Sequence, residues 1–210
     1  MKLLLIGATG LVGHQVLTQA LDDPRVETVI APSRRPLSTS HRKLVAPIVR
    51  FDDLPREADW WQADAAICTL GTTIGKAGSR EAFREVDHDY PLAVARLARA
   101  HGTPRFAVVS AKGANRKSPV FYSRVKGETE ADLTALDFPS LTIVRPGLIG
   151  GDRTERRAGE HLALLVLERL GPGLPRAWRI NPAARIAKVL LDAALGDRMG
   201  TAVIDSAEMA

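Results

Sequence analysis

The sequence of 210 residues has a single cysteine, few aromatic residues and no long apolar segment. Cys68 has no second cysteine to pair with, which excludes an internal disulfide and favours a reducing compartment; we expect the cytoplasm. No apolar run reaches the length that spans a membrane. The apolar residues at the N-terminus lead into glycines instead of a small-residue cleavage site, which indicates a buried strand and not a signal peptide. We therefore expect no membrane partner.

The positive charge is spread along the whole chain. The formal net charge is +5 and aromatic residues make up 5% of the sequence, but no compact basic run or known nucleic-acid motif occurs. We expect no nucleic-acid partner, and we assign the surplus charge to solvated surface with a local contribution at an anionic ligand site. The five histidines show no metal-ligand spacing, so no metal site is predicted.

Short apolar runs alternate with amphipathic helical patterns throughout the chain. Strand-like runs cover residues 2–6, 26–31, 42–50, 65–70, 105–110, 141–145 and 202–204, and helical patterns cover residues 11–21, 87–101, 120–136, 159–170 and 182–195. This alternation predicts an α/β fold with a doubly wound parallel sheet of the Rossmann type. Pro47 within the third run indicates a strand at a sheet edge. We expect one domain over residues 1–210, with residues 151–180 forming a small substrate-side insertion over the crevice.

A glycine motif follows the first predicted strand and opens the first predicted helix. Gly7, Gly10 and Gly13 have the spacing G-x-x-G-x-x-G. In this context glycines permit a tight turn, let a diphosphate approach the backbone and allow the helix to pack closely on the sheet. The start of the helix supplies free N–H groups and a partial positive charge. The predicted phosphate site comprises Gly7, Thr9, Gly10, Leu11, Val12 and Gly13, with the hydroxyl of Thr9 as a further donor.

The residues after the second predicted strand indicate which dinucleotide binds. An NAD site usually places an acidic residue at the carboxyl end of this strand, where it binds the ribose hydroxyl groups. Glu27 has a suitable distance from the glycines but precedes the apolar run, so we place it at the opposite edge of the sheet. Ser33, Arg34 and Arg35 stand at the carboxyl end instead, and the two arginines can bind a 2′-phosphate. We therefore expect NADP(H) in preference to NAD(H).

A serine, a tyrosine and a lysine follow the fifth predicted strand. Ser110 ends that strand, and Tyr122 and Lys126 are four residues apart in a predicted helix, which places them on one helix face. A free tyrosine is a poor base at neutral pH because its pKa is about 10. A neighbouring ammonium lowers that pKa and suits the tyrosine to proton exchange with a carbonyl or an alcohol. Ser110 is then expected to hydrogen-bond the substrate oxygen, and Lys126 also to hold the nicotinamide ribose.

The chain resembles the short-chain dehydrogenase/reductase superfamily over nearly its whole length, in the atypical NAD(P)-binding branch that includes the Tat-interacting oxidoreductase-like proteins. The matching segments are IGATGLVG, PSRRP, CTLGTTIGKAGS, VDHDYP, VVSAKGANRKSPVFYSRVKGETE, IVRPGLIGGDR and INPAARIAKVLLDAAL. Asp87 occupies the place where many extended relatives carry an asparagine or aspartate. The resemblance implies further cofactor contacts: Leu70, Gly71 and Thr72 near the adenosine and ribose, and Pro146, Gly147 and Leu148 beside the nicotinamide.

These observations predict an NADP(H)-dependent oxidoreductase that moves hydride to or from a small carbonyl or alcohol by a Ser-Tyr-Lys mechanism. The substrate-binding extension of nucleotide-sugar epimerases is largely missing, which argues against that substrate class. The alternative is an NADP(H)-binding redox sensor or protein-interaction module without turnover, because some members of this broad branch bind the cofactor without converting a substrate. The expected partner is a small-molecule substrate, with a homodimer or a protein partner as further possibilities.

Overall fold

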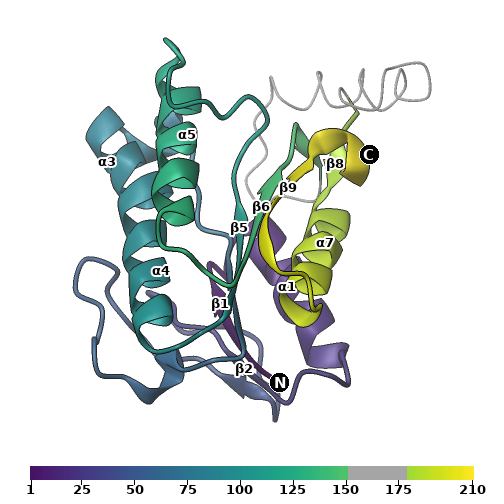
Figure 1. The fold of residues 1–210 in the computed structure, drawn as a ribbon. Helices are drawn as coiled ribbons and strands as arrows, with labels where there is room; N and C mark the ends of the chain where they lie inside the picture. Colours follow the sequence, from purple (N-terminus) through teal and green to yellow (C-terminus); the bar gives the residue numbers. More distant parts are fainter. Residues whose placement is uncertain (151–178) are drawn as a thin grey trace.

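The structure, a computed structural model, describes residues 1–150 and 179–210. Seven strands form one parallel sheet in the order β3-β2-β1-β4-β5-β6-β9 (Figure 1). The chain runs outward from β1 to β3, returns to place β4 beside β1, and then continues outward to β9, so a crevice forms at the carboxyl ends where the direction reverses. The strands are β1 Lys2–Ile6, β2 Thr28–Ile30, β3 Leu44–Val45, β4 Ala65–Cys68, β5 Arg105–Val109, β6 Ser140–Arg145 and β9 Gly200–Asp205, and a separate short pair is β7 Ile149–Gly150 with β8 Asn181–Pro182.

Helices cover both faces of the sheet. The helix pair α1 and α7 lies on one face and the pair α4 and α5 on the other (Figure 1). The helical elements are α1 Leu11–Asp22, η1 Asp59–Trp61, α2 Ile74–Ala77, α3 Arg80–Arg84, the π-helical turn η2 Glu85–Asp89, α4 Tyr90–Ala100, α5 Phe121–Thr134, α7 Ala183–Leu195 and the 3-10 turn η5 Ser206–Met209. This three-layer arrangement confirms the predicted doubly wound α/β fold.

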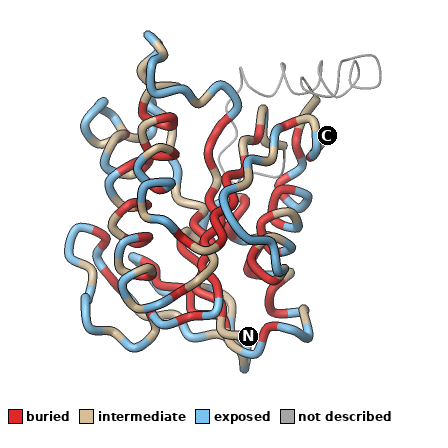
Figure 2. The backbone as a smooth tube through the Cα atoms, viewed as in Figure 1, coloured by how far each residue is buried: buried red, intermediate tan, exposed pale blue. Residues whose placement is uncertain are grey.

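The core divides into two apolar clusters because side chains of a strand alternate between the faces of the sheet. In β1, Leu3 and Leu5 pack in the cluster beneath α1 and α7, whereas Leu4 and Ile6 pack in the cluster beneath α4 and α5. All four side chains are fully buried. Figure 2 shows the buried residues concentrated along the central strands and on the inner faces of the helices.

Two predicted elements differ from the structure. The third strand is limited to Leu44–Val45. Beyond β3 the chain still pairs with Ser33, which follows β2: Ser33 N donates to Pro47 O, and Val49 N donates to Ser33 O. Pro47 therefore lies at the sheet edge, as predicted. The helix predicted over residues 87–101 begins later in the structure. Its first residues belong to the π-helical turn η2, which follows α3, and α4 begins at Tyr90. The helix predicted near residues 159–170 and most of the predicted insertion 151–180 lie outside the described residues. Within residues 1–150 and 179–210, no helix is long and apolar enough to cross a membrane.

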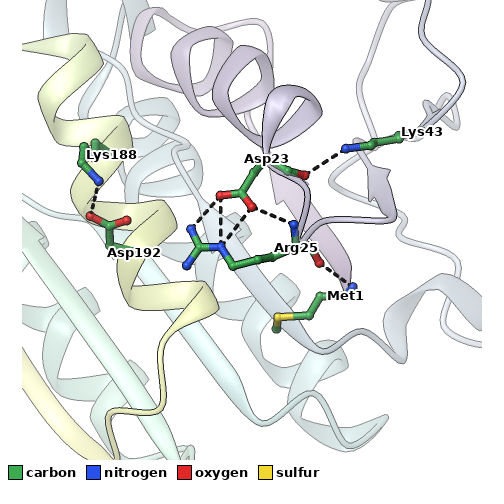
Figure 3. A network of polar contacts seen from close by, with 6 residues as sticks. All are labelled: Met1, Asp23, Arg25, Lys43, Lys188 and Asp192. Atoms are coloured by element: carbon green, nitrogen blue, oxygen red, sulfur yellow. Dashed lines mark hydrogen bonds and ion pairs between the residues drawn. The ribbon is translucent and has the colours of Figure 1, made fainter.

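A polar network closes the amino-terminal edge of the sheet, opposite the crevice (Figure 3). The Nζ atom of Lys43 donates to the carbonyl oxygens of Leu21, in the last turn of α1, and of Asp23, its C-cap residue, each at 2.9 Å. The guanidinium of Arg25 donates from Nε to Asp23 Oδ1 at 3.0 Å and from Nη2 to Asp23 Oδ2 at 2.6 Å. These hydrogen bonds hold the pKa of Asp23 at about 2, below the usual 3.8.

Asp23→Asn is expected to lower the free energy of unfolding at pH 7 by up to about 1 kcal/mol, the upper range for an exposed ion pair. The contribution of the Asp23 carboxylate is present above pH 3.8 and is lost as the pH falls through about 2, because the wild-type carboxyl then protonates. Urea titrations of wild type and variant at neutral pH and near pH 2 measure the difference. The matched control is Asp22→Asn at the exposed neighbouring position. A difference that is independent of pH would contradict the prediction.

Candidate active site

Two glycines of the first turn are required by the packing of the protein itself. Gly7 has φ +91°, and a Cβ atom there would lie 2.6 Å from Thr69 Oγ1. A Cβ atom on Gly13 would lie 2.0 Å from the Gly7 carbonyl oxygen. The first turn of α1 therefore packs directly on the ends of β1 and β4, and any side chain at these two positions forces the helix away from the sheet.

The outer side of the same turn is open. Thr9 and Gly10 are exposed, and a Cβ atom on Gly10 would meet only the Gly7 carbonyl oxygen, at 3.3 Å. Gly10 is the N-cap of α1 and no side chain caps the helix, so the N–H groups of its first turn, including those of Leu11 and Val12, lack intrahelical partners. An exposed backbone with uncapped N–H groups fits a diphosphate.

The turn after β2 presents two arginines at the carboxyl edge. Ser33 is buried and its hydroxyl donates to the Arg35 carbonyl oxygen at 2.5 Å, which holds the turn, while Arg34 and Arg35 are exposed. Glu27 lies at the opposite edge, where it pairs with the N-terminal ammonium at 3.4 Å. The structure thus places the arginines, and not the acid, beside the crevice.

A depression of about 380 Å³ lies beside Arg34. The rings of Phe51 and Tyr90, with centroids 5.7 Å apart, contribute to its lining. Arg50 and Asp52 also line it, and they pair with each other at 2.5 Å. The depression therefore combines aromatic surface with the charge of Arg34, which suits a planar base that carries a phosphate nearby.

A buried ion pair lies behind the turn that follows β4. Lys126 Nζ of α5 is 2.6 Å from Asp87 Oδ1 of η2, and both side chains are almost completely buried. The other carboxylate oxygen of Asp87 accepts a hydrogen bond from Thr72 N at 2.7 Å. Gly71 covers the pair, since a Cβ atom there would lie 3.5 Å from Asp87 Oδ1 and 3.9 Å from Lys126 Nζ. Asp87 therefore joins the predicted segment Leu70 to Thr72 to the predicted lysine.

The electrostatics of this pair favour a charged lysine. Burial by itself lowers the pKa of Lys126, but the negative charge of Asp87, aided by Tyr122, more than offsets burial, and the pKa lies above that of a free lysine. Lys126 therefore keeps its ammonium at neutral pH. Asp87 was not among the predicted site residues, although the family resemblance marked its position. It lies on the π-helical turn, a feature that is frequent at functional sites.

The pKa of Tyr122 shifts in the direction opposite to the sequence prediction. Burial raises the pKa, the charge of Lys126 lowers it in part, and the charge of Asp87 raises it further, so the pKa lies above the ordinary value of 10.0. Only the lysine entered the prediction, whereas burial, and after it the charge of Asp87, raises the pKa of Tyr122. The ring packs against Phe83, with centroids 5.5 Å apart. Tyr122 therefore holds its proton at neutral pH and can act as an acid.

The hydroxyl of Ser110 is directed at a glutamate that the sequence analysis did not include. Ser110 Oγ donates to Glu130 Oε1 at 2.5 Å, and Glu130 accepts from Arg145 Nε at 2.9 Å and Arg145 Nη2 at 2.5 Å. These three residues connect β5, α5 and β6. Because a hydroxyl has one proton, Ser110 with this partner has no second proton to donate, and the hydrogen bond expected between Ser110 and a substrate oxygen stays a prediction. The four-residue spacing of Tyr122, Lys126 and Glu130 is the sequence signal for this residue.

The segment after β6 lies beside the segment after β5. Lys112 N donates to the Pro146 carbonyl oxygen at 2.8 Å, and Gly147 N donates to Asn181 Oδ1 at 2.7 Å. Leu148 exposes 43% of its surface. Asn181 is a second residue that the sequence analysis did not identify, because its partner Gly147 is distant in the sequence.

The predicted residues gather at one edge of the sheet, at the carboxyl ends of β1, β4, β5 and β6. Gly7 packs against Thr69, Gly71 lies over the Lys126–Asp87 pair, and Lys112 N donates to Pro146 O. Ser33 to Arg35 lie farther out along the same edge, after β2. The exception is the Ser110 hydroxyl, whose partner is Glu130. The edge thus offers an open glycine turn, a cationic turn and a buried lysine near a protonated tyrosine.

Comparison with known proteins identifies the family. No protein-family model matches the chain. It is 36% identical over 205 residues to the mitochondrial protein fmp52 of Aspergillus fumigatus, covering 91% of this chain and 86% of that protein. It is 35% identical over 190 residues to HTATIP2 of Rattus norvegicus, covering 89% of this chain and 76% of that protein. The chain belongs to the atypical short-chain dehydrogenase/reductase family. The predicted resemblance is confirmed.

Solved structures of the wider short-chain dehydrogenase/reductase group share the fold. MoeE5, determined in complex with UDP-glucose and NAD, superposes with a TM-score of 0.73 at 16% identity. The alignment covers 97% of this chain and 75% of MoeE5. This atypical member therefore has the fold of that neighbour with about a quarter of the neighbour's chain unmatched.

The names of the fungal relatives correct one prediction. The fmp52 proteins of several fungi are named mitochondrial, which contradicts the cytoplasmic location expected from the sequence. That expectation rested on the lone cysteine and the character of the N-terminus. A lone cysteine excludes an internal disulfide but does not distinguish one reducing compartment from another, so the inference was wrong.

Proposed function

We propose that this atypical short-chain dehydrogenase/reductase is an NADP(H)-dependent oxidoreductase that transfers hydride to or from a small carbonyl or alcohol. The observation that carries the proposal is the buried Lys126–Asp87 pair near Tyr122, at the sheet edge that also holds the open phosphate turn. Burying two charges costs desolvation free energy even when they pair, so such a pair is not needed for stability. Ionisable groups with perturbed pKa values in a crevice are candidate functional groups.

The cofactor is held from one end of the crevice to the other. In this proposal the backbone from Gly7 to Gly13, with the Thr9 hydroxyl, binds the diphosphate, Arg34 and Arg35 bind the 2′-phosphate, and Ser33 holds their turn. The segments Leu70 to Thr72 and Pro146 to Leu148 border the remaining parts of the dinucleotide. Bound NADPH supplies hydride from its nicotinamide ring.

Tyr122 is the catalytic acid of the reduction. As hydride reaches the carbonyl carbon, the Tyr122 hydroxyl gives its proton to the carbonyl oxygen, which completes an alcohol. The phenolate left behind is stabilised by the Lys126 ammonium, whose charge is maintained by Asp87. In the reverse direction the same phenolate accepts the alcohol proton. Asp87 is a positioning residue, because it orients Lys126 and the backbone of Thr72 at once.

The orientation of the Ser110 hydroxyl limits what it offers a bound substrate. With its proton directed at Glu130, the Ser110 oxygen gives no hydrogen bond to a carbonyl oxygen. Tyr122 then provides the donor to the carbonyl in the reduction.

Ser110→Ala is expected to reduce turnover of the carbonyl by less than about tenfold, because Tyr122 still donates the proton. It removes a buried hydrogen bond to a carboxylate and should destabilise the fold by about 1.5–3 kcal/mol. Steady-state kinetics in the reductive direction and urea denaturation measure the two effects. A loss of turnover as large as that of a Tyr122 variant, with little change in stability, would instead make Ser110 a hydrogen-bond donor to the substrate carbonyl.

The function is tested by following the absorbance of NADPH over a panel of aldehydes and ketones. The proposal expects NADPH consumption with stoichiometric alcohol formation, and deuterium transferred from labelled cofactor to the alcohol carbon. The second candidate is an NADP(H)-binding redox sensor or protein-interaction module, which is favoured by the commitment of the Ser110 hydroxyl to Glu130. It expects tight NADPH binding, no consumption over the panel and a protein partner.

A further inference from the structure

The segment after β6 is held by a fully buried asparagine. Asn181, at the start of β8, has no exposed surface. Its side-chain oxygen accepts hydrogen bonds from Gly147 N at 2.7 Å and from Ser206 Oγ at 2.9 Å. Its side-chain nitrogen donates to the Ser206 carbonyl oxygen at 2.9 Å. One carboxamide therefore connects the segment after β6 with the C-terminal turn η5.

The C-terminal turn is itself firmly anchored. Asp205 and Glu208 form a reciprocal capping box, and Met209 is fully buried in the cluster beneath α1 and α7. Ser206 lies so close to Gly147 that a Cβ atom there would be 2.9 Å from Ser206 Oγ. The turn thus provides a rigid base on which Asn181 orients the Gly147 backbone.

Hydrogen bonds fix the orientation of the backbone in the segment Pro146 to Leu148. Pro146 has no N–H group and its carbonyl oxygen accepts from Lys112 N, while the N–H of Gly147 is directed at Asn181. Leu148 follows with an exposed apolar side chain. The peptide unit between Pro146 and Gly147 is therefore held at both its carbonyl oxygen and its N–H group, and Leu148 presents apolar surface at the carboxyl edge of the sheet, where a planar ring can pack.

We infer that Asn181, supported by Ser206, is a positioning residue that orders the segment Pro146 to Leu148 for the nicotinamide end of the cofactor. The inference rests on the proposed NADP(H) site and extends it to the C-terminal turn. A purely structural asparagine would affect the whole fold. A positioning residue affects the half of the cofactor that contacts its segment and leaves the other half unchanged, because the sites after β1 and β2 lie on different strands.

Two ligands separate these possibilities. NADPH contains the nicotinamide half, whereas 2′,5′-ADP contains only the adenosine half with the 2′-phosphate. Asn181→Ala is expected to weaken NADPH binding about tenfold, because the segment must then be ordered at the moment of binding, and to change 2′,5′-ADP binding less than twofold. Ser206→Ala leaves the Gly147 hydrogen bond in place and is expected to give a smaller loss, about threefold, that is also confined to NADPH.

Isothermal titration of the full-length chain with both ligands measures the affinities. Thr103→Val is the matched control, because it removes buried hydrogen bonds to Trp61 O and Ala63 N before β5, at the other edge of the sheet. Equal weakening of both ligands by the Asn181 and Ser206 variants, or no weakening of either, would overturn the inference while the proposed function stands. If wild-type protein binds neither ligand, the proposed function fails and the inference fails with it.

Discussion

Tyr122→Phe is expected to reduce the rate of carbonyl reduction by about a thousandfold, within the range of positioned acid catalysis, with little change in NADPH affinity. The variant keeps the ring that packs against Phe83 and removes only the hydroxyl that carries the transferred proton. Burial raises the pKa of Tyr122 above 10.0, so the wild-type acid is fully protonated at neutral pH. Reduction limited by this group should therefore persist through neutral pH and be lost only above pH 10.

Single-turnover kinetics with a responsive aldehyde and a fluorescence titration of NADPH separate the chemical step from binding. Thr134→Ala is the matched control, since it removes a hydroxyl from the same helix about three turns away. Its rate should equal that of wild type. Turnover of Tyr122→Phe within tenfold of wild type would exclude Tyr122 as the acid, and equal losses in rate and in NADPH affinity would indicate a binding role.

The double variant Arg34→Ala, Arg35→Ala is expected to weaken NADPH about a hundredfold while it changes NADH affinity less than about threefold. The two dinucleotides differ only in the 2′-phosphate, and hydrogen bonds to charged groups contribute about 1.5–3 kcal/mol each when well formed. Both arginines are exposed, so salt screens their effect, and we expect the smaller end of that range.

Titrations of both dinucleotides at low and high salt measure this preference. Arg42→Ala is the control, because it removes an exposed positive charge from the same connection between β2 and β3. The NADPH preference of wild type should decrease with salt, whereas the residual affinity of the double variant should change little. Equal weakening of NADPH and NADH would remove the arginines from 2′-phosphate recognition.

Much of the fold could be predicted from local patterns. Alternating burial in β1, with Leu3 and Leu5 on one face and Leu4 and Ile6 on the other, follows from strand geometry. The turn of Gly7 and Gly13 was predictable because the glycine spacing stands between a strand pattern and a helical pattern, whereas the contact of both glycines with Thr69 is seen only in the fold. The two-residue length of β3 could not be predicted, because an edge strand ends where its single neighbouring strand ceases to pair with it.

The sequence by itself determined the doubly wound sheet, the carboxyl edge as the candidate site, and the common helix face of Tyr122 and Lys126, since these depend on chain order and helical spacing. Only the tertiary structure decided the electrostatics. Asp87 reaches Lys126 from another helical element, and together with burial it reverses the pKa shift expected for Tyr122. Glu130 accepts a hydrogen bond from Ser110 Oγ, and Asn181 Oδ1 accepts one from Gly147 N, in both cases between residues distant in the sequence. Hydrogen bonds and charge interactions depend on distances of a few ångströms, and such distances between remote residues exist only once the chain has folded.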